Sequence, residues 1–240
     1  MIRARYYRNV INPSTGYAQG RYADGSFLTD AGNAFSFTRF ITEGAPCHYT
    51  WYAPHDIYGL MECMGGKEKY IAKLDSMFSE HRYWHGNEPC HQIAYLFNYA
   101  GQPWKTQREV RHIMETEYLN APGGLSGNDD AGQMSAWYVF SAMGFYPVCP
   151  GTPYYIIGSP SFPRMSIRLE NGKTFTILAH NANKKNIYIQ SAKLNGKEYD
   201  KNYFTHQDIV QGGTLEFQMG PNPNTSWGAS ALSLPPDNMK

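Results

Sequence analysis

The chain has 240 residues, of which 42% are hydrophobic and 15% aromatic, so it can bury a core as one large domain or two small ones. A formal net charge of +1 argues against a nucleic-acid partner, and no apolar run approaches the roughly 20 residues needed for a membrane span. The first residues lack the charged and apolar regions of a secretion signal, so we expect no signal peptide in this chain.

The four cysteines are scattered along the sequence. Cys47, Cys63, Cys90 and Cys149 form no C-x-x-C pair. The pattern therefore predicts neither a zinc knuckle nor a dense disulfide framework, and the redox compartment stays open.

The first part of the chain is predicted to be helical. Apolar spacing indicates a helix over residues 1–11, and a loop rich in glycine and serine follows over residues 20–39, anchored by phenylalanines. Breaks in the pattern separate further expected helices over residues 45–64 with an interruption at Pro54, 66–78, 89–100, 104–119 and 130–143.

After Pro147 the pattern changes to the alternation of half-buried strands. Strands are expected over residues 154–157, 165–169, 174–178, 186–190 and 214–218. Asn171-Gly172 and Asn195-Gly196 are strong hairpin signals, and the tail over residues 221–240 is expected to pack irregularly around Trp227. The sequence therefore predicts an α + β fold that changes from helices to strands near residue 150.

Three polar clusters precede predicted helices, at residues 42–44, 85–89 and 127–130. If successive helices run up and down, the starts of alternate helices emerge at the same end, and the clusters converge there. The sequence also places much aromatic material near these helix starts: Trp51, Tyr52, Trp84, Trp104 and Trp137. Aromatic rings stack on sugar faces while carboxylates bind hydroxyls, so the combination indicates a sugar site.

The Asp129-Asp130 pair has several readings. It falls at the expected start of a helix, where unpaired N–H groups stabilise negative charge. Two carboxylates there could bind a cation, activate a water molecule or merely cap the helix. This stretch alone leaves the three readings open.

The cluster at residues 85–89 also has alternatives. Asn87 is a good N-cap residue, with Pro89 just inside the expected helix. His85, Glu88 and His91 have the spacing of zinc ligands, but Pro89 disturbs the single helix face that such a site needs. Amide, carbonyl and carboxylate oxygens favour calcium instead.

Several long motifs of the sequence are specific enough to indicate a family. They are Thr42-Glu43-Gly44 and residues 49–56, 85–89, 94–104 and 127–147, and the similarity continues to Trp227-Gly228. In these motifs the chain resembles glycoside hydrolase family 92, whose members are calcium-dependent exo-α-mannosidases that invert the anomeric centre.

This resemblance implies an architecture. The family has an N-terminal β-sandwich followed by an (α/α)6 toroid, and this chain resembles only the C-terminal portion. Residues 1–149 are then a helical toroid segment that carries the catalytic motifs, and residues 150–240 are a C-terminal antiparallel β region. The missing β-sandwich domain is an expected partner.

The resemblance also implies roles for individual residues. Glu43 is the general acid and Asp130 the general base, assisted by Asn128 or Asp129. The implied sugar contacts are His85, Glu88, Trp51 and Trp137, and the implied Ca²⁺ ligands are Asn87, Glu88 and Asp129. An inverting pair of carboxyl groups is expected about 6.5–9.5 Å apart, with Asp130 kept ionised at its helix start and Glu43 kept protonated by desolvation beside Phe40, Ile41 and Trp51.

The expected substrate is an α-mannoside glycan of the N-glycan or mannan type, hydrolysed in the periplasm, at the surface or outside a bacterial cell. Arg82 follows His81 where relatives that cleave α-1,2 linkages have a His-Glu pair, so the linkage stays open. One alternative is a fragment that binds calcium or carbohydrate and needs the N-terminal part for catalysis. Another is a structural domain in which the acids only cap helices.

Overall fold

The computed structural model describes residues 2–30 and 32–239. It divides into two compact units, Met1–Ile93 with Asp237–Lys240 and Ala94–Pro236, and each is described by itself. The two units do not coincide with the division expected from the sequence near residue 150, which stays a prediction about family architecture. No helix within the described ranges is both long and apolar enough to cross a membrane.

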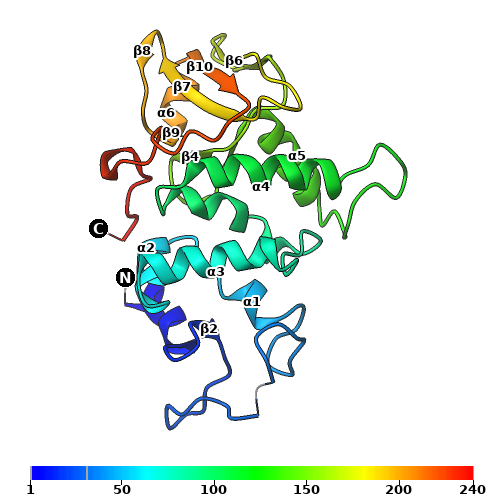
Figure 1. Cartoon of the computed structure of the whole chain (residues 1–240), viewed down its shortest axis with the longest axis vertical. Coiled ribbons are helices and arrows are strands. Elements are labelled where there is room, and N and C mark those ends of the chain that lie inside the picture. Colours follow the sequence, from blue (N-terminus) through cyan, green and yellow to red (C-terminus); the bar gives the residue numbers. More distant parts are fainter. Residues whose placement is uncertain (1, 31, 240) are drawn as a thin grey trace. The chain divides into compact units, whose positions relative to one another are not determined.

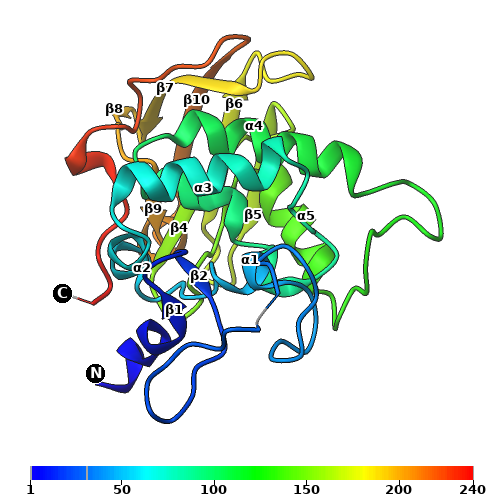
Figure 2. The same ribbon diagram turned by 60° about the horizontal axis from the view of Figure 1, so that its bottom comes forward.

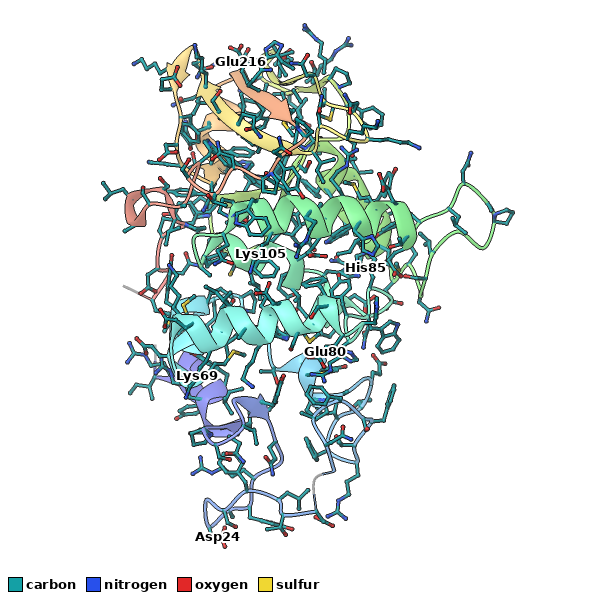
Figure 3. The ribbon with its side chains drawn as sticks, in the orientation of Figure 1. Asp24, Lys69, Glu80, His85, Lys105 and Glu216 are labelled. Atoms are coloured by element: carbon teal, nitrogen blue, oxygen red, sulfur yellow. The ribbon has the colours of Figure 1, made fainter. Side chains whose placement is uncertain are left out.

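The first unit contains short helices and one small hairpin. Its elements are the 3-10 helix η1 (Arg3–Val10), strands β1 (Ile11–Asn12) and β2 (Tyr17–Ala18), helices α1 (Pro46–Tyr49), α2 (Ile57–Cys63) and α3 (Lys67–Ser79), and the 3-10 turn η2 (Glu88–Cys90). A long loop joins β2 to α1, and Figure 3 labels Asp24 at its tip. Asp24 holds this tip by accepting hydrogen bonds from the N–H and hydroxyl of Ser26 at 2.9 and 2.7 Å.

The N-terminal helix is of the 3-10 type and has no buried residue. It was expected over residues 1–11, of which Met1 lies outside the described residues. Tyr7 anchors it by donating a hydrogen bond of 2.8 Å to the buried carboxylate of Asp56, which also accepts from Arg8 at 3.5 Å. Tertiary bonds, and not an apolar helix face, therefore fix this segment.

The helix predicted over residues 45–64 is two helices. Helix α1 ends at Tyr49, and α2 begins only at Ile57. Pro54 cannot donate a helical hydrogen bond, and the Asp56 side chain accepts from Gly59 N at 2.9 Å, which starts a new helix. The predicted interruption is confirmed, but it separates two helices completely.

The prediction of an α-helix over residues 89–100 is wrong. The segment forms the 3-10 turns η2 and η3 (Ile93–Asn98). Residues 93–98 are all fully buried, so the segment has no solvent-facing side and its packing overrides helix propensity. Gln92 also donates to the carbonyl of Pro89 at 2.8 Å, which satisfies a backbone acceptor by a side chain.

The second unit joins two helices to a β region (Figure 1). Its elements after η3 are α4 (Pro103–Thr116), α5 (Gln133–Met143), β3 (Phe145–Tyr146), β4 (Tyr154–Ile157), β5 (Arg164–Arg168), β6 (Thr174–His180), β7 (Tyr188–Leu194), β8 (Lys197–Glu198), β9 (Tyr203–Thr205), α6 (His206–Val210), β10 (Gly213–Gly220) and the 3-10 turn η4 (Ala231–Ser233). The loop between α4 and α5 stands out from both helices in Figures 1 and 2.

The strands form a five-stranded sheet, in the order β5-β6-β10-β7-β8, and a three-stranded sheet, β3-β4-β9. Both predicted hairpins are confirmed, and Asn195 and Gly196 both have positive φ angles of 51° and 79°, as a tight hairpin turn requires. The predicted antiparallel pairing holds except between β10 and β6, which run parallel. The described chain therefore has the predicted α + β fold with one mixed sheet.

Both sheets share one core. Side chains from β3, β4, β6, β7, β9, β10 and α6 meet in it, and Trp227 from the tail packs there as expected. Its indole donates a hydrogen bond of 3.2 Å to the carbonyl of Tyr199. Helices α4 and α5 pack against each other and against β7 and β3, so the β region supports the helices that flank the Asp129-Asp130 loop.

Candidate active site

Glu43 lies in a tight loop of the first unit, three residues before α1, and it is exposed. The next residue, Gly44, has a φ of +82°, and a Cβ there would meet His48 Nδ1 at 3.0 Å and Trp84 Cζ3 at 3.5 Å. Only glycine adopts this conformation in this space without strain. Gly44 thus fixes the direction in which the chain presents Glu43.

His48 connects the Glu43 loop to the segment that begins at Arg82. Its Nδ1 accepts from Ala45 N at 3.0 Å, so the proton lies on Nε2, which donates to the carbonyl of Arg82 at 2.9 Å. Burial lowers the pKa of His48 and keeps the ring in this neutral form. These bonds join the chain just after residues 42–44 to the chain just before residues 85–89 within the first unit. The convergence of the three polar clusters stays a prediction.

His85, labelled in Figure 3, is almost completely buried. Its Nδ1 lies 2.7 Å from Tyr83 Oη, and its backbone carbonyl lies 3.0 Å from His91 Nε2. The two imidazole rings are 4.8 Å apart, and burial together with the neighbouring His91 lowers the pKa of His85 to about 2. His85 is therefore neutral and packed in a tyrosine and histidine cluster.

Asn87 and Glu88 follow at η2. Asn87 is 4% exposed, and among the described residues no hydrogen-bond partner is found for its Nδ2. Side-chain amide and carboxylate oxygens are the hard donors that calcium prefers, so the two residues fit part of a calcium site by their chemistry. No group of three His, Cys, Asp or Glu side chains within the described ranges is arranged to hold a metal.

Asp129 belongs to the second unit and is committed to the start of α5. Its two carboxylate oxygens accept from Ser135 N at 2.9 Å and Ser135 Oγ at 3.0 Å. Its backbone carbonyl accepts from Gly132 N and Gln133 N at 3.1 and 2.7 Å. These bonds support the capping interpretation of Asp129, although the N-cap position itself is Gly132.

Asp130 differs from its neighbour. The prediction that α5 begins at Asp130 is wrong, because residues 130, 131 and 132 have left-handed φ angles of 44°, 58° and 92° and the helix begins at Gln133. Asp130 is exposed, and among the described residues no hydrogen bond or ion pair of its carboxylate is found. Asn128 is exposed as well. The carboxylate of Asp130 is therefore exposed on this loop, whereas the carboxylate of Asp129 accepts the hydrogen bonds that stabilise the loop.

Two aromatic residues predicted as sugar platforms belong to the core. Trp51 and Trp137 are both completely buried, Trp51 against Tyr70 and Trp137 parallel to Tyr118 at 6.0 Å. A ring enclosed on both faces cannot stack on a sugar, which corrects the interpretation of both residues. Their sequence neighbours could not reveal this, because tryptophan is frequent both in cores and at binding sites.

Exposed aromatic rings instead line a cavity of about 370 Å³ in the first unit. Phe35, Phe37 and Trp84 contribute to it together with Arg82, whose guanidinium carbon lies 3.5 Å from the centre of the Phe35 ring. Phe37 is 72% exposed and Trp84 36%. Trp84 and the anchoring phenylalanines stand out in the sequence, but only the fold brings these side chains together.

The predicted site residues are divided between the two units. The first unit contains Glu43, Trp51, His85, Asn87 and Glu88, and the second contains Asn128, Asp129, Asp130 and Trp137. The separation expected between the carboxyl groups of Glu43 and Asp130 stays a prediction. Glu43 is exposed, so its described neighbours do not supply the desolvation expected for a protonated acid.

Comparisons with known proteins agree on one family. The model of the glycosyl hydrolase family 92 catalytic domain matches residues 1–221. A family GH92 α-mannosidase structure from Bacteroides thetaiotaomicron is 43% identical with a TM-score of 0.90, and the match covers 96% of this chain and 31% of that one. A structure of an α-mannosidase of the same description in complex with mannoimidazole is 41% identical, with a TM-score of 0.90 and coverage of 96% and 33%.

Two further relatives extend the comparison. The family GH92 inverting mannosidase from Bacteroides thetaiotaomicron VPI-5482 is 40% identical with a TM-score of 0.93, and the match covers 100% of this chain and 36% of that one. An uncharacterized secreted glycosidase of Arthroderma benhamiae is 36% identical over 189 residues, which are 78% of this chain and 24% of the relative. The chain thus spans about a quarter to a third of the length of these relatives, and it belongs to glycosyl hydrolase family 92.

Proposed function

We propose that this chain carries the acid and base of an exo-acting α-mannosidase that releases mannose with inversion. The observation that carries the proposal is the match of the whole chain, at 40% identity, to a structure described as an inverting mannosidase. The complex of a similar α-mannosidase with mannoimidazole supports an α-mannoside as the substrate. A domain that only binds carbohydrate is not favoured, because the matching family model describes a catalytic domain.

Glu43 donates a proton to the glycosidic oxygen as the bond from that oxygen to the anomeric carbon breaks. Asp130 accepts a proton from the water molecule that attacks the opposite face of the sugar. The exposed carboxylates of both residues support these roles, since each is accessible to a ligand. At the start of the reaction, Glu43 must be protonated and Asp130 must be ionised. A bound sugar excludes water from the site, and this desolvation helps the two carboxyl groups to differ in protonation.

Asn87 and Glu88 are the residues that we assign to a calcium ion, because both provide oxygen donors and they are adjacent, Asn87 as the N-cap and Glu88 as the first residue of η2. Such an ion, when bound, would act as a Lewis acid that coordinates adjacent hydroxyl groups of the sugar. The sequence-based assignment of Asp129 as a third ligand receives less support, because both of its carboxylate oxygens accept hydrogen bonds from Ser135.

We further propose that the protein acts outside the cell. The support is the description of the Arthroderma benhamiae relative as a secreted glycosidase. A bacterial periplasmic or surface location stays a prediction from the family resemblance.

The function is tested by incubating the intact protein with α-1,2-, α-1,3-, α-1,4- and α-1,6-linked mannobiosides and measuring free mannose. We expect release from at least one of them and none from a β-mannobioside or an α-glucoside. The same series determines the linkage, which Arg82 after His81 leaves open. Absence of mannose release from every α-mannoside, with calcium present, would contradict the proposal.

A further inference from the structure

The turn that carries Asp130 has an uncommon backbone. Asp130, Ala131 and Gly132 follow one another with φ angles of 44°, 58° and 92°. Asp and Gly tolerate the left-handed region, but alanine has no side-chain group to offset the cost of about 1–2 kcal/mol. Such a conformation persists only where surrounding contacts determine it, and such turns cluster at functional sites.

The contacts that determine this turn come from Asp129 and Ser135. The Asp129 carboxylate accepts both the N–H and the hydroxyl of Ser135, so one residue before the turn is tied to one residue after it. The Asp129 carbonyl accepts two N–H groups at the beginning of α5, from Gly132 and Gln133. Together these bonds close a ring around the three left-handed residues.

The first turn of α5 is also fixed from its other side. Tyr118 Oη donates to the carbonyl of Met134 at 2.9 Å, and its ring lies parallel to the fully buried Trp137. Asp129 and Ser135 therefore act on a helix start that cannot shift freely.

Resting on the proposed function, we propose that Ser135 and Asp129 are positioning residues that hold the left-handed turn and thereby aim the Asp130 carboxylate at the attacking water. Neither residue touches the reacting atoms. A displacement of about 1 Å in such a group is enough to slow a reaction on the order of 100-fold. The hydrogen bonds of Asp129 thus serve catalysis through the position of its neighbour.

The test uses three variants of the intact protein with an α-mannobioside that it hydrolyses. Ser135→Ala removes the hydroxyl, Ser135→Thr keeps it, and Ser141→Ala is the matched control in the same helix. Ser141 Oγ lies 2.8 Å from Tyr95 Oη and is completely buried, so its removal also costs one hydrogen bond of α5. We expect kcat to fall about tenfold in Ser135→Ala with KM within about twofold, and to be restored in Ser135→Thr. Ser141→Ala is expected to lose stability but to keep its kcat at a temperature where it is folded.

Azide provides a second readout that a purely structural role would not change. Azide forms a bond to the anomeric carbon without giving up a proton, while the glycosidic bond breaks and the leaving oxygen takes its proton from Glu43. If Ser135→Ala impairs only the activation of water, azide accelerates this variant more than the unsubstituted protein and gives β-mannosyl azide. Ala131→Gly, which removes the left-handed strain, is expected to lower kcat without lowering the unfolding temperature.

The outcomes separate the two proposals. If the unsubstituted protein releases mannose but Ser135→Ala loses no more kcat than Ser141→Ala, or Ser135→Thr does not restore it, the positioning role is overturned and the proposed function stands. If the unsubstituted protein releases no mannose from any α-mannoside, both are overturned. Should Ser135→Ala fail to fold, an unchanged kcat in Ala131→Gly still contradicts the positioning role.

Discussion

Asn98 and Asn202 each donate a side-chain hydrogen bond to the other's backbone carbonyl, at 2.9 and 3.0 Å, in the interior of the second unit. Asn98 also donates to the carbonyl of Ile157 at 2.9 Å, and Asn202 to that of Gly228 at 2.7 Å. The pair thus ties η3 to β4, to the residue before β9 and to the tail. Both residues are completely buried, so the carbonyls that they bind are shielded from bulk water.

We expect Asn202→Ala to lower the free energy of unfolding by about 2–4 kcal/mol, because the carbonyl of Gly228 loses its side-chain donor and that of Asn98 keeps only Gly101 N. Urea unfolding followed by fluorescence measures this change. Asn186→Ala is the matched control, since the half-buried Asn186 also donates to a backbone carbonyl, that of Asn181, in a solvent-exposed hydrogen bond, and the substitution is expected to cost well under about 1 kcal/mol. Equal effects of the two substitutions would show that the pair has no special role.

The buried histidines predict a loss of stability in acid. Folding lowers the pKa of His85 to about 2, and it lowers those of His48 and His91, from an unfolded value near 6.5. Because the folded values are depressed, this contribution is complete above about pH 6.5 and is lost as the pH falls from there toward 2. For His85 the loss approaches about 1.4 kcal/mol per pH unit well below pH 6.5.

Unfolding measured at pH 6.5 and 5.5 tests this prediction with His85→Gln. The loss of stability between the two pH values is expected to be smaller by about 1 kcal/mol in the variant than in the unsubstituted protein, because the unfolded histidine is already half protonated at pH 6.5. His112→Gln, at an exposed position, is the control and is expected to leave the loss unchanged. An unchanged loss in His85→Gln would mean that His85 is not the group that titrates.

The role of Glu43 depends on how much the leaving group needs a proton. We expect Glu43→Gln to slow hydrolysis of a mannobioside about 10²–10⁴-fold, and to slow hydrolysis of 2,4-dinitrophenyl α-mannoside far less, because dinitrophenolate leaves without a proton. Glu62→Gln, at an exposed carboxylate paired with Arg8 in the same unit, is the control. Equal losses on both substrates would rule out a general acid at this position.

Calcium binding is predicted at Asn87 and Glu88. We expect Ca²⁺ to raise the thermal midpoint of the chelator-treated protein and Glu88→Gln to weaken binding at least about tenfold, in proportion to the lost carboxylate. Glu80→Gln serves as control, because Glu80 is an exposed partner of Arg82 in the same unit. Calorimetric titration with Ca²⁺ measures the affinity of each variant. Identical affinities in Glu88→Gln and Glu80→Gln would show that Glu88 is not a calcium ligand.

The sequence predicted those elements best whose residues divide into a buried and an exposed side. The helices expected over residues 66–78 and 104–119 appear as α3 (Lys67–Ser79) and α4 (Pro103–Thr116), and the strand expected over residues 174–178 appears within β6 with alternating burial. Residues 93–98 carry no such division, because all are buried, and their 3-10 form follows from packing. The parallel pairing of β6 with β10 joins segments far apart in the chain, which alternation cannot indicate.

The site followed the same physical limits. The family resemblance of the motifs implied roles for Glu43 and Asp130, and these roles stay predictions. The residues alone could not distinguish Asp130 from Asp129, since the difference depends on three left-handed residues and on the hydroxyl of Ser135. Nor could they show that Trp51 and Trp137 are buried while Trp84 and Phe37 are exposed.

Proton NMR of the first mannose released tests most directly whether an acid and a base hydrolyse the substrate with inversion. Hydrolysis of an α-mannoside by the intact protein is expected to give β-mannose first, with α-mannose rising only as the sugar mutarotates. Asp130→Asn is expected to abolish this signal, whereas Asp75→Asn, in α3, is expected to keep it. Release of α-mannose as the first product would contradict the assignment of Asp130 as a base acting on water.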